Sequence, residues 1–334
     1  MKRIKQNILN KMIDSHILWL QDDSQGEPLN LHNCDLSHMN LNNIILRKAN
    51  LTDVDFTNTS LIKADLGQAE LSFANLANAN LTESRLCEAI LYKTNLTKTN
   101  LKKAYMWKVD MRQSNLQEAN LEETDLKGAK LQESSLWNAY LNKANLNHAN
   151  LTNVNLGEAS LFNTSLIGAN LHQVYLFNTS LIGANLTKAS LNRANLNKTD
   201  LWGANLTDVD LRGAFMNEIN LSEVKGLKSQ YEILKENFKF TRGGIIVYKI
   251  FNFYFNINCN WKIESESIIK ENINNQRTVS CGCGINVATK QWARDQIMCS
   301  SHNYKIWKCL IPYKYLSDVC VPYSFKGKFR LSVV

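Results

Sequence analysis

A large apolar residue occupies every fifth position of this chain from Leu31 to Leu221, without interruption. The series contains 39 consecutive registers, and all but four of them are leucine. The exceptions are also large and apolar, namely Phe56, Met106, Met111 and Met216. No other property of the sequence restricts the fold of residues 31–221 as strongly, because the backbone must place every fifth side chain in the same kind of environment.

This period of five excludes a conventional helix or strand. A helix repeats every 3.6 residues and a strand every two, so either would scatter the leucines around its surface. The chain must therefore turn once per repeat. The residue two positions before each central leucine is usually small, which predicts a narrow, filled core with one large and one small inward side chain per repeat. Alanines at this position include Ala49, Ala64, Ala69, Ala74, Ala79 and Ala89.

Asparagine or aspartate often stands just before the central residue. Both tolerate tight turns and can bond nearby backbone groups, so we expect the chain to turn at this position. Examples are Asn50, Asp55, Asp65, Asn75, Asn80, Asn95 and Asn100.

The repeated unit resembles the pentapeptide-repeat family, whose signature is A(D/N)LXX. The chain spells it as ANLTD from Ala49, ADLGQ from Ala64 and ANLAN from Ala74. The resemblance covers residues 29–225 and implies a mainly β fold, a right-handed quadrilateral β-helix in which four repeats form one square coil. With coils about 4.8 Å apart, the repeats would form nearly ten coils and a rod about 45 Å long. Each central residue would point inward and the next two outward.

Apolar segments flank the repeats and predict caps for the ends of the rod, which would otherwise expose open edges and core. Residues 1–28 contain an amphipathic helical pattern that predicts a cap, with a membrane-surface helix or a partner helix as the alternatives. Residues 226–240 contain a second pattern that predicts a short capping helix or linker. Lys11, Asp14 and His16 interrupt the first pattern, so we expect no signal peptide, no transmembrane segment and a cytoplasmic protein. The apolar residues of the first pattern are Ile4, Ile8, Met12, Ile13, Ile17 and Leu20.

The five-residue period is absent after Gly243, which indicates a second domain over residues 241–334. Short apolar runs predict strands at 245–255, 305–311, 319–323 and 329–334, and residues 287–296 predict a helix. We interpret this region as a small α+β domain. The combination of rod and cysteine-containing domain is loosely similar to uncharacterised phage and viral proteins, so a viral or phage origin is an open alternative.

Positive charge is concentrated in the C-terminal part. Residues 31–225 hold 18 basic and 19 acidic side chains, whereas residues 226–334 hold 16 basic and 7 acidic ones. Any anion or nucleic acid would therefore be attracted to the C-terminal domain. A lysine-rich solubilising surface is the simpler explanation, because no nucleic-acid-binding motif accompanies the charge.

Four residues of the C-terminal domain could hold zinc, since four nitrogen and sulfur ligands are typical of structural zinc sites. They are Cys281, Cys283, Cys299 and His302. The spacing of the first two is C-x-C, and no second close pair follows, so free thiols in a reducing compartment are the favoured interpretation. No phosphate-binding loop or nucleophile with a positioned base is present, and we expect no enzymatic activity.

The rod offers one candidate interaction surface. Residues twenty apart should stack on one side, so Phe162, Ile182 and Trp202 would form an outward apolar column, with Trp137 and Phe177 on the neighbouring side. Exposed aromatic clusters are typical of protein interfaces. The opposing interpretation is that the C-terminal domain or a dimer mate covers this surface.

Three functions are compatible with the sequence. The favoured one is a non-catalytic scaffold that binds a protein partner, whose identity and whose effect on oligomeric state are left open. In the second, the C-terminal domain is a zinc-, anion- or nucleic-acid-binding module, or an enzyme, carried on the rod. The third follows from the resemblance, because some family members imitate the DNA duplex and bind DNA gyrase. The near-neutral rod disfavours it.

Overall fold

The computed structural model describes residues 1–227 without a gap, together with six strand segments of the C-terminal part. These segments comprise residues 239–241, 244–252, 285–287, 304–312, 319–320 and 331–333. The chain divides into two compact units, Met1–Leu227 and Lys228–Val334, and each is described by itself.

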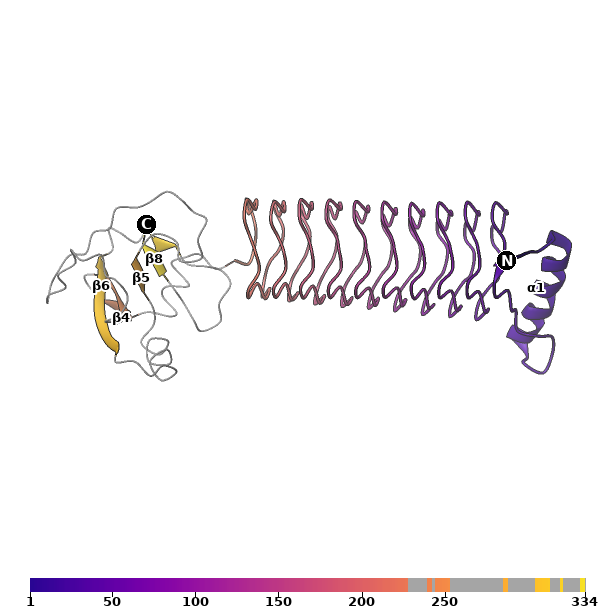
Figure 1. Ribbon diagram of the computed structural model, residues 1–334, viewed down its shortest axis with the longest axis horizontal. Helices are drawn as coiled ribbons and strands as arrows, with labels where there is room; N and C mark the ends of the chain where they lie inside the picture. The colour runs from indigo at the N-terminus through magenta and orange to yellow at the C-terminus, as the bar shows by residue number, and fades with distance from the viewer. Residues whose placement is uncertain are drawn as a thin grey trace. The chain divides into compact units, whose positions relative to one another are not determined.

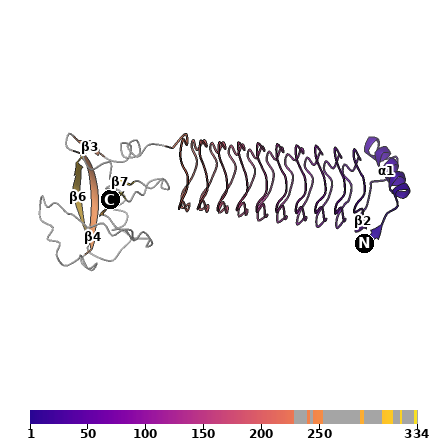
Figure 2. The same cartoon turned by 90° about the horizontal axis from the view of Figure 1, so that it is seen from above.

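The first unit is a stack of twenty-residue coils, visible in two views (Figures 1 and 2). Parallel β-bridges join residues twenty apart, from Asn30 with Asn50 to Asn205 with Lys225. Backbone hydrogen bonds run between coils in both directions: the N–H of Leu51 donates to the carbonyl of Glu70 at 2.7 Å, for example. Four five-residue repeats therefore form one coil, as the sequence predicts. We number the four sides by the central residues of the first coil, Leu31, Leu36, Leu41 and Leu46.

The turns lie at a different position from the one predicted. The backbone enters the left-handed region two residues after each central residue, with φ of 57° at Asn33 and 59° at Lys188. No residue with positive φ is β-branched among those of the rod, because a branched Cβ is strained there. The Asn or Asp before the centre instead bonds a nearby backbone group, as also predicted: Asn50 Oδ1 accepts the N–H of Thr52 at 3.2 Å.

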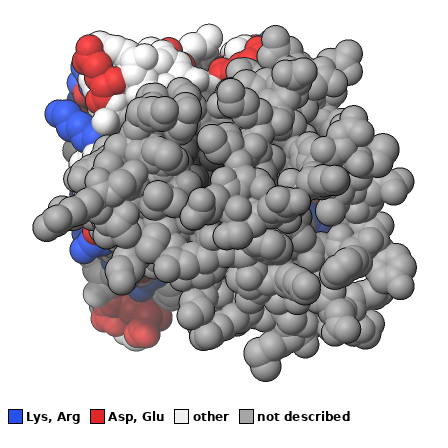
Figure 3. Space-filling view, turned by 90° about the vertical axis from the view of Figure 1, so that its left-hand side faces the viewer, with Lys and Arg blue, Asp and Glu red and all other residues white. Residues whose placement is uncertain are grey.

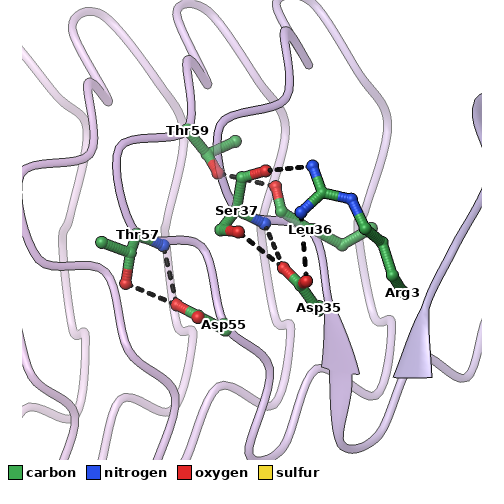
Figure 4. Close-up of polar contacts among 7 residues, drawn as sticks. All are labelled: Arg3, Asp35, Leu36, Ser37, Asp55, Thr57 and Thr59. Carbon is green, nitrogen blue, oxygen red and sulfur yellow. Dashed lines mark hydrogen bonds and ion pairs between the residues drawn. The ribbon is translucent and has the colours of Figure 1, made fainter. Parts of the chain in front are cut away.

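The core consists of the central leucines and the small residues between them, and both are almost completely buried. Where the small residue is Thr or Ser, its hydroxyl usually donates to a carbonyl of the preceding coil. Thr59 donates to the Leu36 carbonyl at 2.8 Å (Figure 4), and Ser114 to the Leu91 carbonyl at 2.5 Å. Ser134 occupies the same position, but its hydroxyl has no partner among the described residues.

The N-terminal segment caps the first coil. Strand β1 (Lys2–Arg3) pairs in parallel with β2 (Cys34–Asp35) and adds a rung below it. The Arg3 guanidinium bonds the Asp35 carboxylate at 3.2 Å and the Ser37 carbonyl at 3.3 Å (Figure 4).

Helix α1 (Gln6–Gln21) follows β1, and its inward face differs from the predicted one. Leu9 and His16 are fully buried, whereas Ile8 is 49% exposed. The prediction that Ile8 faces the core is wrong, because the helix begins at a phase that turns Leu9 inward instead. Ile4, Met12 and Ile13 do pack against the core, as predicted.

The described part of the second unit contains two antiparallel sheets. The predicted capping helix or linker over residues 226–240 does not include Lys239 and Phe240, which belong to β3, and residues 228–238 lie outside the described residues. In the predicted helix over 287–296, Val287 instead belongs to strand β5, and residues 288–296 lie outside the described residues. The first sheet has the order β3 (Lys239–Thr241), β4 (Gly244–Asn252), β6 (Tyr304–Pro312). The second has the order β5 (Ile285–Val287), β8 (Leu331–Val333), β7 (Val319–Cys320).

Candidate functional site

Side 3 carries an apolar column in three consecutive coils, formed by Phe162, Ile182 and Trp202. The N–H of Asn163 donates to the Ile182 carbonyl at 2.9 Å, and the N–H of Gly183 donates to the Trp202 carbonyl at 2.9 Å. These bonds stack the three residues directly above one another. Phe162 is 43% exposed and Trp202 is 45% exposed, while Ile182 is half-buried between them. We call these three residues the side-3 column.

In the register that directly follows the column, no side chain is charged. The residues that follow its members are Asn163, Gly183 and Gly203. The same register lower on side 3 carries ion pairs between coils, with Lys63 Nζ 3.6 Å from the Glu83 carboxylate and Lys103 Nζ 3.7 Å from that of Glu123. This register of side 3 therefore changes along the rod from paired charges to uncharged residues, and the nearby Asp200 carboxylate accepts the N–H of Trp202 at 3.0 Å.

The other two residues of the predicted interaction surface, Trp137 and Phe177, lie on side 2 and are separated by the coil that contains Gly157. Trp137 is 37% exposed. Phe177 is half-buried, because Tyr175 stacks against it with ring centroids 6.1 Å apart and Lys198 Nζ lies 5.6 Å from its ring centroid. Phe177 is therefore a poorer anchor than the sequence indicates.

Gly157 makes room for the Tyr175 ring. A Cβ at Gly157 would lie 3.0 Å from Tyr175 Cε1, so a side chain there would push the ring outward. Tyr175 is itself 41% exposed, and Tyr140, at the corner between sides 2 and 3, is 47% exposed. Tyr140 therefore lies on the route from Trp137 toward the side-3 column, whereas Tyr175 lies at the opposite corner of side 2, next to side 1.

A second aromatic group, which the sequence analysis missed, lies on sides 4 and 1. Phe73 packs edge-on against Tyr92, with ring centroids 5.8 Å apart, while Tyr105 and Trp107 are 55% and 38% exposed. Cations cover the rings: Lys93 Nζ lies 5.3 Å from the Tyr92 ring centroid, and Lys108 Nζ lies 5.5 Å from that of Trp107. Reading the outward registers of all four sides would have found this group.

The charges of the rod are mixed in sign. Where described residues are visible in Figure 3, acidic and basic side chains lie close to one another. Many form pairs between neighbouring coils, such as Lys102 with Glu122 at 2.7 Å. Over residues 31–225, 18 basic and 19 acidic side chains leave the rod close to neutral.

The described residues contain no candidate metal centre and no activated cysteine thiol. Within them, no group of three or more His, Cys, Asp or Glu side chains could hold a metal ion. Burial raises the pKa of the Cys34 and Cys87 thiols, which makes both poor nucleophiles. The four predicted zinc ligands, at positions 281, 283, 299 and 302, lie outside the described residues. In the part of the chain described, no helix is long and apolar enough to cross a membrane.

Comparison with known sequences identifies the repeats. The sequence profile described as "Pentapeptide repeats (8 copies)" matches six segments that together span most of the first unit. They are residues 30–68, 69–107, 94–132, 119–157, 155–193 and 189–225. Among curated proteins, none matches the chain significantly.

Solved structures include similar proteins. HetL, a pentapeptide repeat protein involved in heterocyst differentiation regulation from the cyanobacterium Nostoc sp. strain PCC 7120, is 31% identical. The match covers 59% of this chain and 86% of HetL, with a TM-score of 0.35. Full-length QnrB1, a plasmid-mediated fluoroquinolone resistance protein, is 15% identical, with 60% of this chain and 98% of QnrB1 covered and a TM-score of 0.31. Rfr23, a pentapeptide repeat protein from the cyanobacterium Cyanothece 51142, is 33% identical, with 35% and 63% covered and a TM-score of 0.12.

The profile match spans more than half of the chain. The matched residues are those that form the twenty-residue coils, and the family fold is a right-handed β-helix. The chain belongs to the pentapeptide-repeat family.

Proposed function

We propose that this protein is a non-catalytic scaffold whose rod binds a protein partner through the side-3 column and the adjoining Trp137. The observation that carries this proposal is the stacking of Phe162, Ile182 and Trp202 in three successive coils with no charged residue in the following register. Contiguous exposed aromatic residues are uncommon on soluble proteins and are typical anchors of protein interfaces.

The β-helix supports this function because it is rigid. Every coil is bonded to the next by backbone hydrogen bonds on all four sides, so the column is held in one geometry before a partner arrives. A preorganised surface loses little conformational entropy on binding. The neutral neighbours Asn163, Gly183 and Gly203 favour a partner surface that is also apolar and weakly charged.

Mimicry of the DNA duplex is less well supported. It requires a strongly acidic surface, whereas residues 31–225 hold 18 basic and 19 acidic side chains. A binding function of the C-terminal domain, for zinc, an anion or nucleic acid, is the remaining alternative, and its basic excess is the feature that favours it.

The test compares two variants of the full-length chain. The double variant Phe162→Ser, Trp202→Ser removes the ends of the side-3 column. Trp107→Ser is the matched control, because Trp107 also follows a central residue and is similarly exposed, but lies on side 4. We expect wild type and the control to retain the same specific partner from an extract of the native cells, and the double variant to lose it.

Binding is then measured with the purified partner by calorimetry. Loss of two aromatic anchors should weaken the affinity at least about thirtyfold, equivalent to about 2 kcal/mol. Equal affinity of all three proteins would contradict the proposal. Preserved affinity in a chain shortened to residues 228–334 would assign binding to the C-terminal unit instead.

A further inference from the structure

His16 is the fully buried polar residue of helix α1, and both nitrogens of its ring are engaged. The N–H of Leu29 donates to Nδ1 at 3.0 Å, and Nε2 lies 2.8 Å from the Arg47 carbonyl oxygen. Because an amide N–H can only donate, Nδ1 must be the unprotonated acceptor. Nε2 therefore carries the proton and donates to Arg47, which fixes the ring as one neutral tautomer.

These two bonds tie together three segments that are separate in sequence. His16 belongs to α1, Leu29 ends the connection to the first coil, and Arg47 lies on side 4 of that coil. Trp19 stacks on the same imidazole with ring centroids 5.6 Å apart and an interplanar angle of 15°. The ring thus supplies the polar contacts of a cap whose apolar contacts come from Leu9, with Ile4, Met12 and Ile13.

A second proton on the ring would break this arrangement. It would place an N–H at Nδ1 against the N–H of Leu29, and it would bury a positive charge. Burial is the main reason that the pKa of His16 lies below its ordinary value of 6.5, and the bond to the Arg47 carbonyl opposes it only in part. The charged side chains on α1, on its connection to the first coil and beside the Arg47 carbonyl contribute no charge interaction to this shift; they are Lys11, Asp14, Asp22, Asp23, Glu27, Arg47 and Lys48.

We propose that His16 is a pH-sensitive latch of the N-terminal cap. The neutral ring holds α1 over the first coil, and protonation releases the helix and opens this end of the β-helix to a second copy of the chain. An uncovered coil exposes apolar core and unpaired backbone groups, which favour end-to-end association in solenoids.

The direction of the pH effect follows from proton binding. Below pH 6.5 the released helix takes up a proton on His16, while the docked helix does not. The docking equilibrium should therefore weaken about tenfold for each pH unit below that value, until the lower pKa of the docked ring is reached. Above pH 6.5, His16 is neutral in both states, so it should give docking no pH dependence.

The first test measures amide hydrogen exchange of residues 6–21 in the full-length chain at about pH 7.5 and about pH 5, corrected for intrinsic exchange rates. His16→Gln removes the titrating ring. His32→Gln is the matched control, because His32 is exposed on the first coil, with Nδ1 3.8 Å from the Asp53 carboxylate. We expect wild type and His32→Gln to lose protection of α1 on acidification, by at most about tenfold for each pH unit below 6.5. His16→Gln should show the same corrected protection at both pH values.

The second test needs no variant that alters the cap. Nitrogen-15 spectra of histidine-labelled wild type report the tautomer of each of the six histidines of the chain and its titration. We expect His16 to be the Nε2-protonated tautomer and to titrate below its ordinary value of 6.5. A pKa of 6.5 or higher for His16, or unchanged protection of α1 in acidified wild type, would overturn the latch.

Discussion

The position of each residue within the five-residue repeat determines its chemistry. The sequence correctly predicts the inward leucine and its small partner, because burial imposes one clear preference at each of these positions. It misplaces the turn, because asparagine is common both before the centre and two residues after it. Asn50 accepts a backbone N–H, whereas Asn33 adopts a φ of 57°. Composition alone cannot separate these two roles, since both favour the same short amide side chain.

Two buried serines provide a test of the core at this scale. Ser114 and Ser134 occupy the same register of adjacent coils on side 2, and each is 2% exposed. Ser114 donates to the Leu91 carbonyl, whereas Ser134 has no partner among the described residues. We expect Ser114→Ala to lower the free energy of unfolding by about 1 kcal/mol, and Ser134→Ala to leave it unchanged or raise it slightly.

Urea denaturation of both variants beside wild type measures this difference. Because only one hydroxyl oxygen is removed in each case, the volume change is the same and cancels from the comparison. A cost at Ser134 equal to that at Ser114 would show that the Ser134 hydroxyl has a partner in solution, such as a water molecule.

The elements that close the rod are less predictable than the repeats. The amphipathic pattern of residues 4–20 predicts a helix, and α1 forms there, but the pattern tolerates more than one rotation about the helix axis. Ile8 and Leu9 are adjacent apolar residues, so hydrophobicity does not decide which one faces the core. The first turn of α1 decides it, and β1 fixes where that turn begins through its pairing with β2.

The adjacent residues Ile8 and Leu9 allow a direct test of the cap. Leu9 is fully buried and Ile8 is 49% exposed. We expect Leu9→Ala to lower the free energy of cap opening by about 2–4 kcal/mol, because it leaves a cavity between α1 and the first coil. Ile8→Ala should cost less than about 1 kcal/mol. Amide exchange of residues 6–21 measures both, and a larger effect at Ile8 would mean that the helix docks in the rotation predicted from sequence.

At the scale of the whole molecule, repetition makes the fold predictable and the site only partly so. A period of twenty residues correctly stacks Phe162, Ile182 and Trp202, since their alignment depends on the backbone alone. It does not reveal that Lys198 and Tyr175 cover Phe177, because those contacts depend on side-chain rotamers.

The zinc content of the full-length protein tests whether the C-terminal unit has a binding site of its own. We expect elemental analysis of the purified full-length protein to find no stoichiometric zinc, because the cysteine spacing of positions 281, 283 and 299 departs from paired zinc motifs. One equivalent of zinc, lost on substitution of Cys281 and Cys283 by serine, would instead place a binding site in the C-terminal unit.

The uniform coil also determines how such a protein can change its surface. Removing twenty residues shortens the rod by one coil and leaves every remaining side chain on its original side. Removing five residues preserves the core equally well, because one leucine replaces another, but it rotates the side-3 column by a quarter turn relative to helix α1. Length and rotational offset can therefore vary in discrete steps without disturbing the hydrophobic interior. Gain or loss of a single repeat can thus turn a binding surface to a new direction without point substitutions in that surface.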